Sequence, residues 1–223
     1  DGWFGQRNDD TAGLGDYTVN KKKLPYGLKG LGDKLLSMGL EFGLWFEPEM
    51  ISEKSDLYQA HPDWAIAVPS RKSKLGRHQM VLDMCNPDVV NYLKGVFDNI
   101  LGRYDIDYIK WDCNRQLSEH YSNVLPADRQ GEMNHRYILG LYELLDYITQ
   151  KWPNVIIEGC AGGGGRFDAG MLYYSPQIWC SDNTDAVDRL YIQYGTSFGY
   201  PTSAVGAHVS VCPNQQNGKI TPF

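Results

Sequence analysis

Short apolar runs that end next to a carboxylate recur along the chain. Runs of this length, bounded by polar residues, predict β-strands. Five of them lie at residues 40–46, 79–82, 107–111, 154–157 and 177–180, and the carboxylates that follow are Glu47, Asp83, Asp112, Glu158 and Asp182. A sixth run at 201–205 leads towards His208. Apolar residues at helical spacing predict helices between the runs, at 28–38, 87–103, 132–151 and 186–198.

This alternation of strand and helix predicts βα units on a parallel sheet. A doubly wound sheet would concentrate its polar groups at one switch point after a glycine-rich first turn, but the glycine run at 162–165 follows a late strand. Carboxylates or aromatics at nearly every strand end favour a barrel instead. We therefore expect an α/β fold in which residues 1–223 form one partial (β/α)8 TIM barrel. Its first strands would be missing, because Asp1-Gly2-Trp3-Phe4-Gly5 resembles a strand exit.

Charge and composition limit the classes of partner that the chain can bind. The chain has 21 Lys and Arg against 27 Asp and Glu, a formal net charge of -6, and its longest basic cluster is Lys21-Lys22-Lys23. This argues against nucleic acid as a partner. No leader pattern and no apolar run of about 18 residues occurs, so we expect no membrane association and a cytoplasmic location. An odd cysteine count without C-x-x-C spacing indicates reduced thiols and no zinc site.

Asp112 and Asp182 are the strongest candidates for chemistry. Both follow predicted strands, so a barrel would bring them to one rim. Retaining glycosidases need two such carboxyl groups about 5 to 5.5 Å apart. We expect Lys110, two residues away on the same strand face, to keep Asp112 ionised, and burial beside Trp179 to raise the pKa of Asp182. A capping or loop role is the structural alternative for either aspartate.

Other strand-end residues admit two interpretations. Trp45, Trp111 and Trp179 can stack on a sugar face or fill the barrel core. The glycine run lets backbone approach a ligand closely, although a flexible loop explains it as well. A structural role is favoured for Glu47 and Asp83, which would hold neighbouring side chains in place.

A metal-dependent barrel is the alternative enzyme class. Glu47, Glu49, Asp83 and Asp112 are oxygen donors of the kind that Mg²⁺ prefers. Lys110 and the three tryptophans suit a sugar better than a hydrated cation, so the metal site is the weaker hypothesis.

Five segments, in order, resemble the catalytic barrel of bacterial family 36 α-galactosidases. They are Asp1-Gly2-Trp3-Phe4-Gly5, Trp45-Phe46-Glu47-Pro48-Glu49-Met50, Lys110-Trp111-Asp112-Cys113-Asn114-Arg115, the stretch 158–166, and Cys180-Ser181-Asp182-Asn183-Thr184-Asp185. The resemblance implies a retaining enzyme that acts without metal or organic cofactor on terminal α-galactosides of the melibiose and raffinose type. It implies Asp112 as nucleophile and Asp182 as acid/base. It also implies a sugar subsite formed by Asp1, Trp45, Arg77, Lys110, Asn114, Cys160 and Gly163.

The same resemblance implies parts that this sequence does not contain. Family members are similar in carrying an aspartate just before Asp1, an earlier barrel strand and flanking β-domains, and their full-length chains are expected to form homo-oligomers. A third hypothesis follows, in which the 223 residues alone are an inactive sugar-binding fragment. An unclosed barrel exposes strand edges and loses part of its subsite.

Overall fold

A four-stranded parallel sheet forms the centre of the computed structural model, which describes residues 1–208 and 210–221. Its strands are β1 (Gly43–Phe46), β4 (Tyr108–Trp111), β5 (Ile156–Gly159) and β6 (Gln177–Ile178). They lie in the order β1-β4-β5-β6, and every neighbouring pair is parallel. The order follows the chain without the reversal that defines a doubly wound sheet. The predicted α/β fold with a parallel sheet is confirmed.

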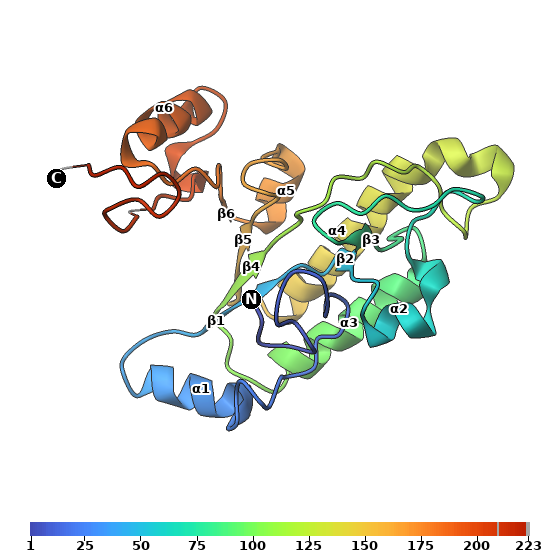
Figure 1. The fold of residues 1–223 in the computed structure, drawn as a ribbon, viewed down its shortest axis with the longest axis horizontal. Helices are drawn as coiled ribbons and strands as arrows, with labels where there is room; N and C mark the ends of the chain where they lie inside the picture. The colour runs from blue at the N-terminus through green and yellow to red at the C-terminus, as the bar shows by residue number, and fades with distance from the viewer. Residues whose placement is uncertain (209, 222–223) are drawn as a thin grey trace.

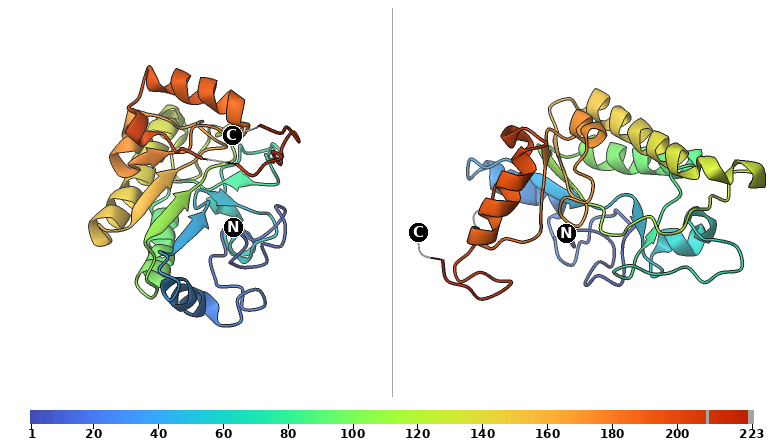
Figure 2. Two further views of the ribbon diagram at one scale, coloured as in Figure 1. Left: turned by 90° about the vertical axis from the view of Figure 1, so that its left-hand side faces the viewer. Right: turned by 90° about the horizontal axis from the view of Figure 1, so that it is seen from above.

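Helices lie in an arc around the outside of this sheet (Figures 1 and 2). The long ones match the predicted ranges, with α1 beginning one residue before its range: α1 (Gly27–Leu36), α3 (Pro87–Leu101), α4 (Met133–Lys151) and α6 (Ala186–Ser197). The start of α3 is set locally, because Pro87 fits the first turn and the Asn86 side chain accepts the Asp88 N–H at 2.9 Å. Shorter helices are α2 (Asp56–Ala60), α5 (Ala169–Tyr174) and the 3-10 turns Pro62–Trp64, Ala127–Glu132 and Thr202–Ala204.

Two predicted strands do not extend the parallel sheet. The run at 79–82 forms β3 (Met80–Val81), which pairs antiparallel with β2 (Met50–Ile51) in a separate two-stranded sheet. The run at 201–205 folds into a 3-10 turn, and Val205 makes an isolated parallel bridge to Ile178. The turn forms because the backbone N–H groups of residues 204 and 205 bond three residues back instead of across to a strand.

The two faces of β4 have different environments. Ile109 and Trp111 are fully buried towards the helices, and the Trp111 ring stacks on Phe97 of α3 with centroids 5.7 Å apart. Trp111 therefore belongs to the core, the second of its two predicted roles. Tyr108 and Lys110 point to the opposite face and are half-buried. This alternation separates a packed outer face from an inner face that carries polar side chains.

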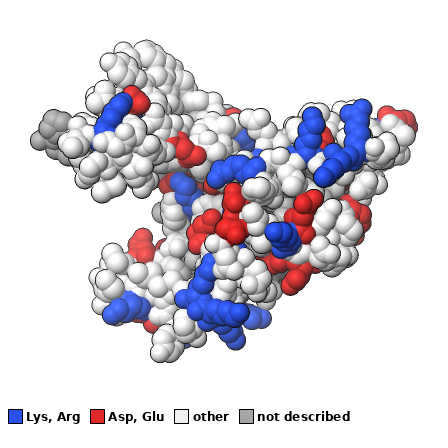
Figure 3. All heavy atoms as spheres, viewed as in Figure 1, with Lys and Arg blue, Asp and Glu red and all other residues white. Residues whose placement is uncertain are grey.

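None of the helices in the described residues has the length and apolar character needed to cross a bilayer. On the face shown in Figure 3, acidic and basic side chains are interspersed, and the surface is hollowed between the part that carries α6 and the part that carries α1.

Candidate active site

Asp112 follows β4 directly and is held by several donors. Its backbone N–H donates to the Phe46 carbonyl at 2.8 Å, which ties it to the end of β1. Its Oδ2 accepts from Trp45 Nε1 at 3.1 Å and from Asn114 Nδ2 at 2.7 Å, and its Oδ1 accepts the Cys113 N–H at 2.9 Å. The residue is 8% exposed. These bonds fix one orientation of the carboxyl group at the carboxyl edge of the sheet.

Arg77 is connected to this carboxyl group through Asn114. Arg77 Nη1 donates to Asn114 Oδ1 at 2.6 Å, while the Asn114 amide donates to Asp112. Arg77 lies on an exposed loop with φ +51°. Three predicted site residues thus form one hydrogen-bonded chain, although they come from two separate loops.

Cys160 and the glycine loop border the other side of Asp112. Cys160 follows β5, is 6% exposed, and bonds through its N–H to the Trp111 carbonyl at 2.7 Å. Burial, reinforced by the nearby Asp112 charge, raises the pKa of the Cys160 thiol to about 12, so this residue presents a neutral thiol. At Gly163, φ is +88° and an added Cβ would meet the Asp182 backbone N at 3.0 Å. Only glycine lets the loop pass this close to Asp182.

Asp182 is positioned by Trp179. The indole Nε1 donates to Asp182 Oδ1 at 3.0 Å. The centroid of the Trp179 ring lies 4.6 Å from the Lys110 ammonium and 4.5 Å from the Arg189 guanidinium. The expected burial of Asp182 is wrong, because the side chain is exposed at the edge of an open hollow of about 580 Å³. Lys110 and Glu158 line the same hollow.

The predicted electrostatic partner of Lys110 also differs from the observed one. Its ammonium forms an ion pair with Glu158, which accepts from Tyr108 as well. Glu158 sits on β5 opposite Lys110 in the strand register, so the two side chains share the inner face. Arg115 likewise pairs with Glu119, at 2.6 Å. The expectation that Lys110 keeps Asp112 ionised overlooked this cross-strand carboxylate.

The first residues of the chain reach the site through Trp45. Trp3 Nε1 donates to the Trp45 carbonyl at 2.9 Å, and Arg7 lies over the Trp45 ring at 5.8 Å. Arg7 Nε also bonds the exposed Asp1 carboxylate at 3.2 Å. The sequence reasoning missed Arg7, and no local signal marks it, because it is a lone basic residue in a polar segment. Trp45 thus contacts Asp112 directly, and Asp1 is linked to Trp45 through Arg7.

The carboxylates that a magnesium site would use face protein donors. Glu49 is fully buried and accepts from Trp111, Tyr137 and both terminal nitrogens of Arg166. Asp83 accepts from Ser122 Oγ at 2.6 Å and from the Cys85 N–H at 3.0 Å, as its predicted structural role requires. Across residues 1–208 and 210–221, no group of three or more His, Cys, Asp or Glu is gathered to hold a cation.

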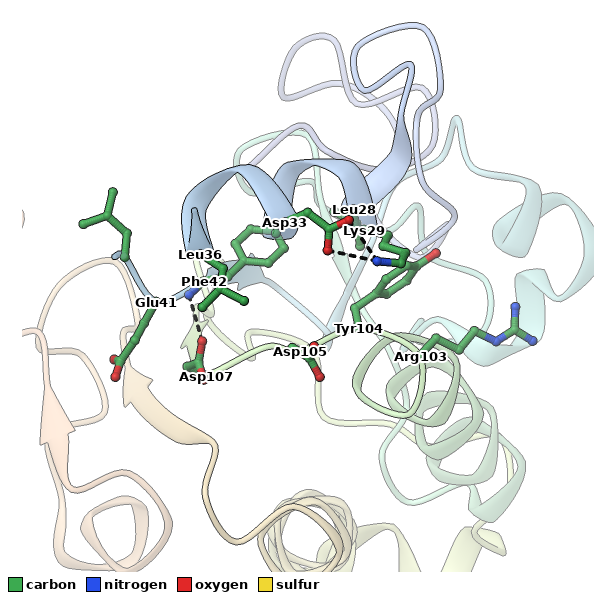
Figure 4. A pocket seen from close by; sticks show the side chains of 12 residues that line it. Leu28, Lys29, Asp33, Leu36, Glu41, Phe42, Arg103, Tyr104, Asp105 and Asp107 are labelled. Carbon is green, nitrogen blue, oxygen red and sulfur yellow. Dashed lines mark hydrogen bonds and ion pairs between the residues drawn. The ribbon is translucent and has the colours of Figure 1, made fainter. Parts of the chain in front are cut away.

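A second hollow of about 460 Å³ lies at the opposite edge of the sheet (Figure 4). It is bounded by α1 and by the segments that enter β1 and β4, where the Phe42 N–H donates to Asp107 at 2.9 Å. Ligands of parallel α/β folds bind at the carboxyl ends of the strands, whereas this hollow borders the amino ends. The candidate active site is therefore the edge that carries Asp112.

Comparisons with known proteins agree with the resemblance found in the sequence. The sequence model of the Melibiase family matches residues 1–223. The chain is 56% identical over 220 residues to alpha-galactosidase AgaA of Geobacillus stearothermophilus, covering 99% of this chain and 30% of that protein. It is 56% identical over 223 residues to alpha-galactosidase Mel36A of Lactobacillus acidophilus, covering 100% of this chain and 30% of that protein.

A solved structure gives the same result. The crystal structure of the GH36 alpha-galactosidase AgaA from Geobacillus stearothermophilus matches with a TM-score of 0.97 at 55% identity, covering 100% of this chain and 31% of that one. The chain thus spans about a third of the length of the relatives that it matches. Its whole length, however, is matched. The chain belongs to the Melibiase family, whose matching relatives are glycoside hydrolases named alpha-galactosidases.

Proposed function

We propose that the protein carrying this chain hydrolyses terminal α-galactosides of the melibiose and raffinose type. The observation that carries the proposal is the fixed Asp112 carboxylate, held by Trp45 and Asn114, with the Asp182 segment across the glycine loop. Family membership supports the same reaction, and variants of the relative AgaA have crystal structures in complex with raffinose and with stachyose. A homo-oligomeric assembly and a cytoplasmic location stay predictions from the sequence.

The mechanism we propose is a double displacement. An Asp112 oxygen attacks the anomeric carbon while Asp182 gives its proton to the departing glycosidic oxygen, which leaves a galactosyl ester on Asp112. Asp182 then takes a proton from water, whose oxygen displaces the ester and restores the original anomeric configuration. Lys110, Arg77 and Asp1 supply donors and acceptors for sugar hydroxyls, and the neutral Cys160 thiol borders the same space.

We further propose that the whole chain is part of one (β/α)8 catalytic domain. Three features support this proposal: the strands are parallel, they follow chain order, and the helices lie along one outer arc. Each is expected of consecutive barrel strands.

Replacing the proposed nucleophile tests the function in the full-length protein. We expect Asp112→Gly to lower kcat for an aryl α-galactoside by about 10⁴-fold, because covalent catalysis is lost. Azide should restore release of the aryl group and yield a β-galactosyl azide, since it enters the space left by the carboxylate from the same face. Asp105→Gly is the matched control, because Asp105 is an exposed aspartate at the opposite edge. Unchanged turnover in Asp112→Gly would refute the assignment.

A further inference from the structure

Glu47 is a second buried carboxylate beside Asp112. It follows β1 as Asp112 follows β4, and the register pairs Phe46 with Trp111, so the two carboxylates stand next to each other on adjacent strands. Glu47 is fully buried. A buried carboxylate is costly unless its oxygens are satisfied, so its partners indicate what it does.

The partners of Glu47 lead to Asp112. Glu47 Oε1 accepts the Asn114 backbone N–H at 2.6 Å, and Oε2 accepts from Gln79 Nε2 at 3.2 Å. The side chain of the same Asn114 donates to Asp112 Oδ2 at 2.7 Å. Glu47 therefore holds the backbone of the residue whose amide orients the Asp112 carboxyl group.

Glu49, two residues further on, serves as a comparison. It is equally buried, but its partners are Trp111 of β4, Tyr137 of α4 and Arg166 at the end of the glycine loop. Both residues lie beyond the end of β1, and their partners distinguish them: Glu47 is connected to Asp112 through Asn114, whereas the donors to Glu49 make no hydrogen bond to Asp112 among the described residues.

We propose that Glu47 is a positioning residue for Asp112, acting through its hydrogen bond to the Asn114 backbone. This inference rests on the proposed function of Asp112 and goes beyond the structural role that the sequence favoured for Glu47. The bond requires an acceptor oxygen at the full reach of a glutamate side chain. It does not require a charge, so shape and charge can be separated by mutation.

Two conservative variants separate these properties. Glu47→Gln keeps the reach and one acceptor oxygen but removes the charge. Its new amide finds a partner because the buried Gln79 Oε1 has no partner among the described residues, so a flip of the Gln79 amide offers that oxygen as an acceptor. Glu47→Asp keeps the charge but is one methylene shorter, which withdraws the acceptor from Asn114.

The experiment measures kcat and KM for an aryl α-galactoside in the full-length protein. We expect Glu47→Gln to retain kcat within about fivefold, and Glu47→Asp to lose about 100-fold in kcat with KM within about threefold, as for a misplaced reacting group. Asp83→Asn is the matched control, since this buried carboxylate bonds Ser122 and Cys85 and should leave kcat unchanged. Equal losses in both variants, wild-type turnover in both, or a larger loss in Glu47→Gln would overturn the proposal.

A wild-type protein without turnover would refute the proposed function and leave positioning to be judged from crystal structures of the variants. We then expect the Asp112 carboxyl group to leave its 3.1 Å contact with Trp45 Nε1 in Glu47→Asp and to keep it in Glu47→Gln. An unmoved Asp112 in Glu47→Asp would overturn the inference by itself.

Discussion

The buried ion pair between Glu49 and Arg166 joins the end of β1 to the end of the glycine loop, and its removal has a calculable cost. Two guanidinium nitrogens each lie 2.8 Å from a Glu49 oxygen, in a bidentate arrangement. Trp111 Nε1 at 3.0 Å and the Tyr137 hydroxyl at 2.7 Å complete the set of donors. Arg166→Met removes the charge while keeping most of the side-chain volume.

The expected loss in the free energy of unfolding follows from the Glu49 charge, which stays buried without its partner. Breaking a buried pair by removing one partner costs about 3 to 5 kcal/mol, because the other charge stays buried without compensation. The Arg166 side chain is 20% exposed, so the lower end, about 3 kcal/mol, applies. For a domain of this size that loss corresponds to a fall in Tm of about 6 to 12 °C.

The pH dependence gives a sharper test than the stability at one pH. Burial alone would raise the pKa of Glu49, but the Arg166 guanidinium reverses this and holds the pKa below its ordinary value. In the wild type, Glu49 therefore contributes stability that is present above about pH 4.5 and lost as the pH falls. In Arg166→Met the guanidinium is gone, so burial raises the pKa of Glu49. Glu49 then becomes protonated and neutral as the pH falls, and the variant is less destabilised in acid than at neutral pH. The difference in Tm should shrink between pH 8 and pH 5.

Calorimetry of the full-length protein over this pH range measures the effect. Arg129→Met is the control, because Arg129 and Glu132 form an exposed ion pair at 2.7 Å, where solvent screening leaves little contribution to stability. A loss in Arg166→Met no larger than in the control, or one independent of pH, would refute the reasoning.

Three further outcomes are expected. Gly163→Ala should lower both Tm and turnover, because its Cβ would meet the Asp182 backbone, whereas Gly39→Ala, at φ +74° with open space around it, should lower Tm alone. Trp179→Phe should lower kcat about tenfold through loss of the bond to Asp182, and an unchanged kcat would contradict that role. Burial raises the pKa of Glu47 to about 7 from an ordinary value of 4.5, so its stabilising contribution is full in acid and lost as pH rises to 7. As the pH rises from 4.5 to 7, the free energy of unfolding of Glu47→Gln should therefore increase by about 3 kcal/mol relative to that of the wild type. Denaturant titrations at each pH measure this difference.

Local sequence was sufficient for the elements whose formation depends on near neighbours. The helix that begins at Pro87 carries its own cap and apolar face, so its range was predictable. The apolar runs before Asp112 and Glu158 both lie in the parallel sheet as predicted, although β5 continues through Glu158 to Gly159. The run at 79–82 has the same pattern but pairs elsewhere, because strand pairing depends on residues far away in the chain.

The candidate site likewise has residues that the sequence indicated and contacts that it did not. Residue type and spacing indicated Asp112 and Asp182, since a carboxylate after an apolar strand reaches the same edge in any parallel α/β fold. Only the tertiary structure decided the partners: Lys110 pairs with Glu158 across the strands, Asp182 lies exposed beside Trp179, and Glu47 reaches Asp112 through Asn114. Hydrogen bonds depend on distances of a few tenths of an ångström between distant segments, and a linear sequence does not carry that information.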